Sequence, residues 1–215
     1  MKWNPEILSK FVAPGISDFT SATIPDLTDE FPQASYWLVN HFLNSVFRTG
    51  FKDRWRQVVI AYLRRAQNAF VAYHNSSEIT ANYLKGNEPQ NPKIGAYFGV
   101  VSSWENFALQ ASMAMDLIRW LNQGQGVFVK NDGTKEQRLY QMANLVKHTA
   151  SAVSSGQCKE SDTLPLWLSN DGLHCFDHAL SYAEASEILR ELAIGAEKFQ
   201  DPQATHEKLR EEDSM

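Results

Sequence analysis

A row of hydrogen-bonding side chains is the part of this sequence best suited to binding. We call Gln137, Gln141, Asn144 and His148 the polar row; their spacings of four, three and four residues place them above one another on a helix. Another face of the same helix is apolar, with Leu139, Met142, Val146, Ala150 and Val153. Such a helix can pack on one side and bind on the other. We therefore expect the polar row to form a ligand- or partner-binding surface.

Glu105 and His148 are the candidates for acid–base catalysis. Asp116 is the only other acid between Ile94 and Ile118, and an acid in so apolar a segment is often paired or functional. A histidine can act as a general base near neutral pH. Both residues also have explanations without catalysis: Glu105 as a side chain that points to solvent, and His148 as a donor to a neighbouring helix that holds the packing.

His174 and His178, with Cys175 and Asp177 between them, would form a metal-binding pair only on a helix. Ser181, which begins the last predicted helix, comes after both. In an extended strand the two histidines would lie about 13 Å apart, whereas zinc holds its nitrogen ligands at about 2 Å. We therefore predict no metal site. The sequence also contains no Gly-x-Ser-x-Gly motif, no Gly-x-Gly-x-x-Gly motif and no phosphate-binding loop, so we predict no cofactor.

Positive charge is concentrated between Arg48 and Arg65, although the whole chain has a net charge of −5. Six basic residues face one acid in this segment, a local charge of +5, and the remaining 14 basic and 24 acidic residues give −10. This asymmetry can indicate a site for an anionic partner. It is also found on a solvated helix face whose charge is balanced by the acidic remainder of the chain, and we favour this second explanation. If RNA binds here, the candidate contacts are Arg56, Arg64 and Arg65.

Five segments in which apolar residues recur every three or four positions predict helices. They cover approximately residues 36–47, 52–73 with a continuation towards 84, 96–121, 134–155 and 181–199. Capping boxes, Thr134 with Gln137 and Ser181 with Glu184, fix the starts of the last two. A turn at 169–172 predicts a hairpin over 163–176. The expected fold is mainly α, an antiparallel bundle of about five helices with a small β-hairpin before the last helix.

The predicted bundle is one domain, at residues 32–200. Pro5, Pro14, Gly15 and Pro25 make residues 1–31 an expected irregular N-terminal arm. Residues 201–215 are expected to be a charged, mobile tail. A length of 215 residues suits a single domain with such appendages.

Composition indicates a soluble cytoplasmic protein of bacterial type. The chain is 43% hydrophobic and 21% charged, as in ordinary globular proteins. It has no run of about 18 apolar residues that could span a membrane, and its first residues lack the apolar core of a signal peptide. Cys158 and Cys175 are therefore expected to be free thiols.

The segment Met142–His148 resembles the last-helix motif of HEPN domains, which are small helical bundles. That motif has an arginine, a polar residue that is often asparagine, three further residues and a histidine; Asn144 and His148 match the last two fixed positions. In active HEPN proteins the arginine and histidine serve RNA cleavage without a metal. This chain has Ala143 at the arginine position, so the resemblance implies a noncatalytic relative that binds a partner, a nucleic acid or a small ligand.

The function expected from the sequence is a noncatalytic, HEPN-like binding or regulatory module. Its partner would be a protein or a small ligand, with no membrane involved; a homodimer and an RNA partner stay open. The alternative is a metal-independent enzyme that cleaves or modifies RNA, with Glu105 and His148 as catalytic groups and the basic helix as a guide for phosphates.

Overall fold

The computed structural model describes residues 3–47, 53–122, 124–157 and 163–200. Within these ranges it contains seven α-helices and one three-stranded antiparallel sheet, so the predicted mainly α fold is confirmed. The five helices with eleven residues or more correspond to the five apolar periodicities. None of the described helices is both long enough and apolar enough to cross a bilayer.

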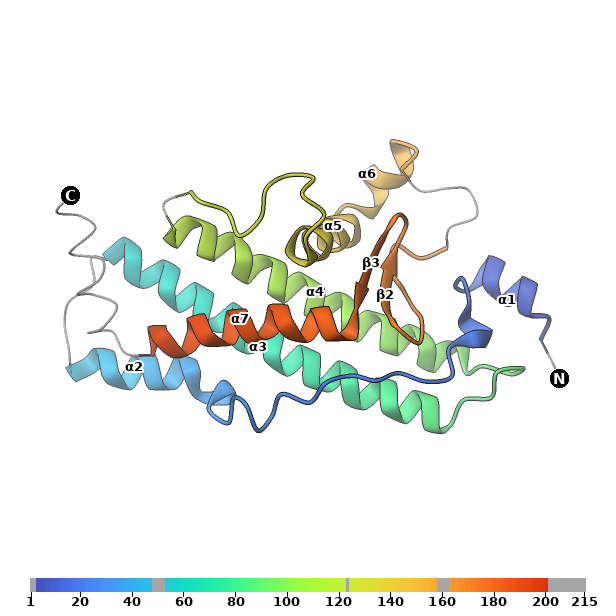
Figure 1. Cartoon of the computed structure of the whole chain (residues 1–215), viewed down its shortest axis with the longest axis horizontal. Coiled ribbons are helices and arrows are strands. Elements are labelled where there is room, and N and C mark those ends of the chain that lie inside the picture. Colours follow the sequence, from blue (N-terminus) through green and yellow to red (C-terminus); the bar gives the residue numbers. More distant parts are fainter. Residues whose placement is uncertain (1–2, 48–52, 123, 158–162, 201–215) are drawn as a thin grey trace.

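Two long antiparallel helices run through the centre of the molecule (Figure 1). α3 (Asp53–Lys85) and α4 (Ile94–Leu121) pack along most of their length. Where they meet, Trp104 is fully buried, and its indole N–H donates to the Thr80 hydroxyl at 3.0 Å. The Tyr73 ring lies edge-on to Trp104, with centroids 5.6 Å apart. The core is thus built from the predicted apolar faces of these two helices.

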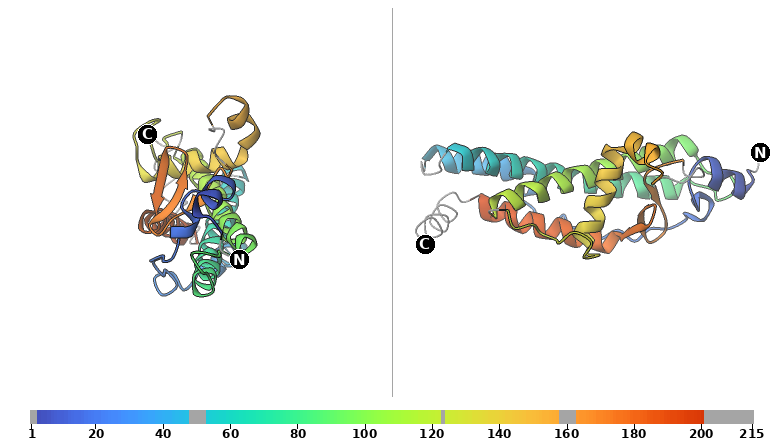
Figure 2. Two further views of the ribbon diagram at one scale, coloured as in Figure 1. Left: turned by 90° about the vertical axis from the view of Figure 1, so that its right-hand side faces the viewer. Right: turned by 90° about the horizontal axis from the view of Figure 1, so that it is seen from above.

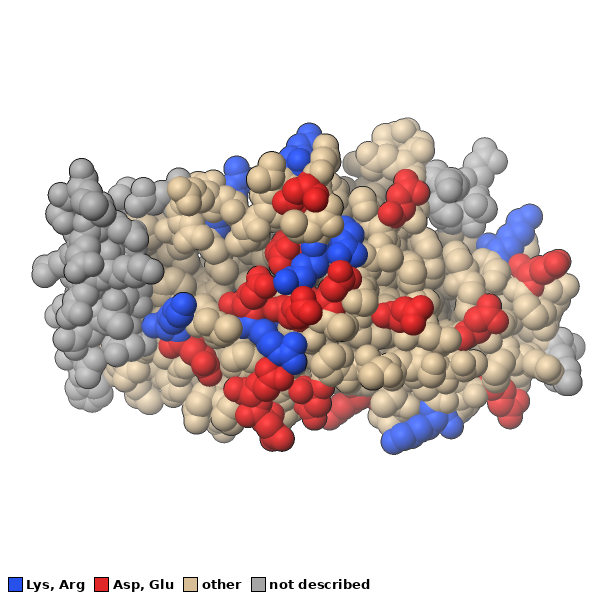
Figure 3. Space-filling view, in the orientation of Figure 1, with Lys and Arg blue, Asp and Glu red and all other residues tan. Residues whose placement is uncertain are grey.

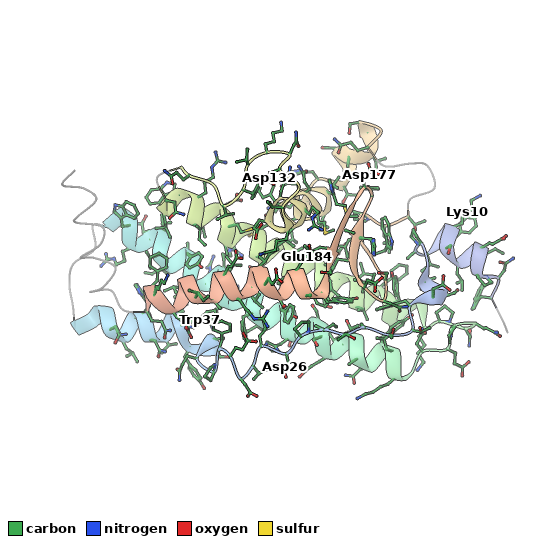
Figure 4. The ribbon with its side chains drawn as sticks, viewed as in Figure 1. Lys10, Asp26, Trp37, Asp132, Asp177 and Glu184 are labelled. Atoms are coloured by element: carbon green, nitrogen blue, oxygen red, sulfur yellow. The ribbon has the colours of Figure 1, made fainter. Side chains whose placement is uncertain are left out.

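α2 (Trp37–Phe47) and α7 (Tyr182–Phe199) pack against α3. The buried Tyr62 hydroxyl of α3 donates to the Leu192 carbonyl of α7 at 2.7 Å, and His41 Nδ1 of α2 lies 2.8 Å from the Phe199 carbonyl. Figure 4 labels Trp37, which lies at the start of α2 near the end of α7. The capping box predicted for α7 is present.

A small sheet precedes α7. The predicted hairpin is confirmed as β1 (Trp167–Leu168) and β2 (Gly172–Cys175), and a third strand, β3 (His178–Ser181), pairs with β2. A Cβ atom at Gly172 would lie 2.2 Å from the Leu180 carbonyl oxygen, so only glycine lets these strands approach. The prediction missed β3 because Phe176 and Asp177, which separate it from β2, do not have the Asn-Gly or Asp-Gly pattern that marks a tight turn.

The predicted helix over 134–155 is two helices, so the expectation that His148 lies in mid-helix is wrong. α5 (Lys135–Lys147) ends at His148, and α6 (Thr149–Ser154) starts after it. His148 has φ −120° and ψ 32°. The Thr149 hydroxyl donates to the carbonyls of Leu145 and Val146 at 3.0 and 3.2 Å, and such side-chain bonds compete with the regular helix ladder. α5 also crosses the bundle instead of running along it (Figure 2).

The N-terminal arm is more regular and more buried than predicted. α1 (Pro5–Phe11) begins at Asn4, whose side chain accepts from the Glu6 backbone N–H, and a 3-10 turn follows at Ile16–Asp18. A second 3-10 turn, Ala34–Tyr36, leads into α2. Arm residues contribute to the core: Leu8, Ala13, Ile16, Phe19 and Leu27 are at most 1% exposed. The predicted tail, 201–215, lies outside the described residues.

Candidate functional site

A cleft of about 510 Å³ lies between α4, α5 and the segment that joins them. α4 contributes Met115, Asp116 and Arg119; the joining segment contributes Gly126, Val127, Phe128 and Lys130; α5 contributes Gln137, Tyr140, Gln141 and Asn144. Its volume is in the range of about 300–1,000 Å³ that is common for small-molecule sites. Three of the four residues of the polar row therefore line one cleft.

The three amides of the cleft differ in how far the fold already uses them. Gln137 is buried; its Oε1 accepts from the Gly133 N–H at 2.7 Å, and its Nε2 donates to Asn131 at 3.4 Å. Thr134 caps α5 as predicted, with its hydroxyl accepting from the Gln137 N–H at 3.3 Å, but the Gln137 side chain completes no capping box because it bonds the Gly133 N–H and not that of Thr134. The half-buried amides of Gln141 and Asn144 have no hydrogen-bond partner within the described ranges. They are the amides that a ligand could use.

The rim of the cleft is held in shape by a turn at its edge. Asp132 accepts from the Val129 N–H at 2.7 Å and from the Thr134 N–H and hydroxyl at 3.0 and 2.8 Å. The Thr134 backbone bond is the largest effect that lowers the pKa of Asp132. Asp132 lies above the start of α5 (Figure 4). Beside it, the rings of Phe128 and Tyr140 are 5.2 Å apart and give the cleft an aromatic wall.

Charged groups of both signs border the cleft. Arg119 and Lys130 are exposed, and Arg119 Nε donates to the Gly124 carbonyl at 3.4 Å. Burial raises the pKa of the Asp116 carboxyl, while Lys147 and Arg119 work in the opposite direction. Three cations, Arg119, Lys130 and Lys147, therefore act on this cleft, against Asp116 in its lining and Asp132 at its rim. The remaining positive charge favours an anionic ligand.

Neither predicted catalytic residue lines the cleft. His148 is exposed at the junction of α5 and α6. Glu105 is half-buried on α4, eleven residues before Asp116, which is about 16 Å along a helix. Burial raises the pKa of Glu105, but no hydrogen bond or ion pair joins it to His148 within the described ranges.

The basic residues proposed for RNA do not form one surface. Arg56 and Arg64 are exposed, whereas Arg65 donates to Gln110 Oε1 of α4 at 2.9 Å. Arg65 follows Arg56 by nine residues, which is two and a half turns of an α-helix, so the two point in opposite directions. Arg48 and Lys52 lie outside the described residues.

The two histidines of the sheet lie on different strands, so the single extended strand assumed for them is wrong. His174 on β2 has its Nε2 2.8 Å from the Ser169 hydroxyl, and the Trp167 ring stacks on it with centroids 5.9 Å apart. His178 on β3 pairs with Cys175, a buried free thiol; Cys158 lies outside the described residues. Among the described residues, no group of three or more His, Cys, Asp and Glu is placed to hold a metal ion.

Sequence reasoning missed the cations of the cleft. Arg119 follows Asp116 by three residues near the end of α4, and Lys130 lies in a segment without periodicity, so nothing local marks either as a binding residue. No family model matches the chain, and neither does any curated protein or solved structure.

Proposed function

We propose that this protein is a noncatalytic binding module that holds a small anionic ligand in the cleft between α4 and α5. The observation that carries the proposal is the convergence of unused amides, Gln141 and Asn144, with two exposed cations, Arg119 and Lys130, around one cavity. Amides recognise hydrogen-bonding groups in a fixed direction, and guanidinium and ammonium groups recognise phosphate or carboxylate. The aromatic wall suits a ligand with a planar ring.

The HEPN-like interpretation is part of this proposal. Asn144, the polar residue of the motif, lines the cleft, and Ala143 at the arginine position is buried and has no functional group. Both features support binding without RNA cleavage.

Calorimetric titration with a nucleoside monophosphate, ribose phosphate and inorganic phosphate tests the proposal. We expect the nucleotide to bind most tightly and more weakly at high salt. Arg119→Ala should weaken binding at least about tenfold, because it removes a charge-assisted contact, and Gln141→Ala should weaken it less. Gln90→Ala, an exposed amide in the loop between α3 and α4, is the matched control. Equal binding by Gln141→Ala, Arg119→Ala and wild type would refute the proposal.

The second candidate function is metal-independent RNA cleavage by Glu105 and His148. Its support is that burial raises the pKa of the half-buried Glu105, which is the direction of shift that a general acid needs. Incubation of the protein with single-stranded RNA in a chelator tests it. Cleavage that is lost in both Glu105→Gln and His148→Ala is the expected result for this candidate; intact RNA with wild-type protein would eliminate it.

A further inference from the structure

Two long stretches of the hairpin of α3 and α4, one in each helix, have few charged residues. Residues 66–84 contain one residue of the Asp, Glu, Lys and Arg types, Glu78, and residues 94–115 contain one, Glu105; about a quarter of the residues of a globular protein are charged. α7 carries six in 18 residues. Figure 3 shows acidic and basic side chains gathered over the face that α7 forms.

The charge-poor side of the hairpin is exposed. α7 and the sheet lie on one side of α3 and α4 (Figure 2), and the described residues place no helix across the opposite side. Large apolar side chains on these two helices are 40–44% exposed: Ile60, Val71, Ile79, Phe98 and Trp120. An exposed face of this kind is typical of a protein–protein contact. We call it the hairpin face.

Along α3, the hairpin face is complementary to itself in charge. Arg64, Val71 and Glu78 are exposed and spaced by seven residues, so they lie on one side of the helix. Neither Arg64 nor Glu78 has an ion-pair partner within the described ranges. If a second α3 runs antiparallel with Val71 facing Val71, Arg64 of each copy meets Glu78 of the other.

Along α4, the hairpin face is complementary to itself in shape, because a large side chain would lie opposite a glycine. Gly99, Asn106 and Met113 are also spaced by seven residues; Gly99 and Asn106 are exposed and Met113 is half-buried. A Cβ atom built at Gly99 would have no atom within 4 Å apart from its two chain neighbours and the backbone of its own helix. If a second α4 runs antiparallel with Asn106 facing Asn106, the Met113 side chain of each copy lies over Gly99 of the other.

Val71 and Asn106, the two residues that face their own copies, lie at the same level of the hairpin. The rings of Tyr73 and Phe107 are 5.5 Å apart, and Arg65 donates to Gln110 at 2.9 Å, so Val71 of α3 lies opposite the Asn106 region of α4. One two-fold axis can therefore pass both residues, and self-complementary pairs about one axis are what an isologous dimer requires.

We propose that the hairpin face binds a second copy of this chain, with α3 antiparallel to α3 and α4 antiparallel to α4. The 28 residues of α4 make about 40 Å of helix, and two packed helices are about 20 Å wide. The face thus offers about 800 Å² per copy, which is the area of a standard specific interface.

Charge-reversal variants of the full chain, measured by sedimentation velocity over a concentration series, test this dimer. Wild type should approach twice the chain mass of 24.4 kDa. Arg64→Glu and Glu78→Arg should each weaken dimerisation by about tenfold, because each dimer contains two such pairs and each change turns attraction into repulsion. The double variant should recover wild-type affinity. Glu88→Arg, the same charge change in the exposed loop before α4, should have no effect.

Gly99→Leu gives an independent readout. It should raise the thermal stability of the monomer, because leucine favours a helix more than glycine and the site has room, yet it should weaken the dimer by filling the space that Met113 of the other copy needs. A monomer at all concentrations up to about 100 μM overturns the proposal. So does a dimer that both single charge changes leave intact, or one that the double change does not restore.

Discussion

His148 is the member of the polar row that lies outside the cleft. It is exposed, and its structural contribution comes from its backbone: its N–H donates to the Asn144 carbonyl and its carbonyl accepts from the Ala152 N–H. Any residue except proline can make both bonds at position 148. The side chain is therefore free to vary unless it has a function.

We expect His148→Ala to change the free energy of unfolding by less than about 0.5 kcal/mol, as exposed substitutions usually do. Gln137→Ala should cost about 1–3 kcal/mol, since it removes the acceptor of the Gly133 N–H. Urea denaturation of both variants beside wild type measures the difference. Equal losses for the two variants would show that His148 has a packing role that its exposure hides.

At the scale of elements, ion pairs link α5 to α7: Lys135 pairs with Glu187 and Glu191, and Arg138 pairs with Glu184 at the start of α7. Arg138 donates to both carboxylate oxygens of Glu184 and to the Ala179 carbonyl of β3. Glu184 also closes the capping box with Ser181; its label in Figure 4 lies at the level of α5. Burial works to raise the pKa of Glu184, but Arg138 and Ser181 outweigh it and hold the pKa below its ordinary value.

A carboxyl with a lowered pKa in the folded state stabilises the protein at pH values above its unfolded pKa of about 4.3, and this contribution is lost as the pH falls through the lower folded value. We therefore expect Glu184→Gln to lower the stability at pH 7 by about 1 kcal/mol or less, and to have a much smaller effect at about pH 3. Thermal melts at both pH values check this. Glu187→Gln, whose carboxyl is 53% exposed, is the control, and an equal loss there would contradict the role given to Glu184.

At the scale of the whole molecule, the N-terminal arm is part of the core. Phe19 is fully buried, and its ring stacks on Tyr83 of α3 at 5.8 Å and meets Tyr97 of α4 edge-on at 6.2 Å. The backbone N–H groups of Thr20 and Ser21 both donate to Asn170 Oδ1 in the hairpin turn, at 2.9 and 3.0 Å. The arm therefore joins the central hairpin to the sheet.

We expect Phe19→Ala to cost about 3–5 kcal/mol, the usual loss for a buried phenylalanine. Phe11→Ala in the same arm should cost less than about 0.5 kcal/mol, because Phe11 is 65% exposed. Denaturant unfolding of the two variants tests the contrast. A small loss for Phe19→Ala would mean that the arm can leave the bundle without unfolding it.

The sequence alone determined where the long helices lie, the caps that begin α5 and α7, and the first hairpin, because these depend on residues a few positions apart. The apolar period defines α3 and α4, and a side chain that bonds a backbone group three residues away fixes the start of α7 at Ser181.

Only the tertiary structure decided which residues meet. Arg119, Lys130 and Asn144 line one cleft although they come from two helices and an aperiodic segment, and no local pattern records that α5 crosses α4. The same holds for Phe19, which is buried by helices more than sixty residues away. Long-range packing sets these positions, and one sequence without its fold does not contain the distances on which that packing depends.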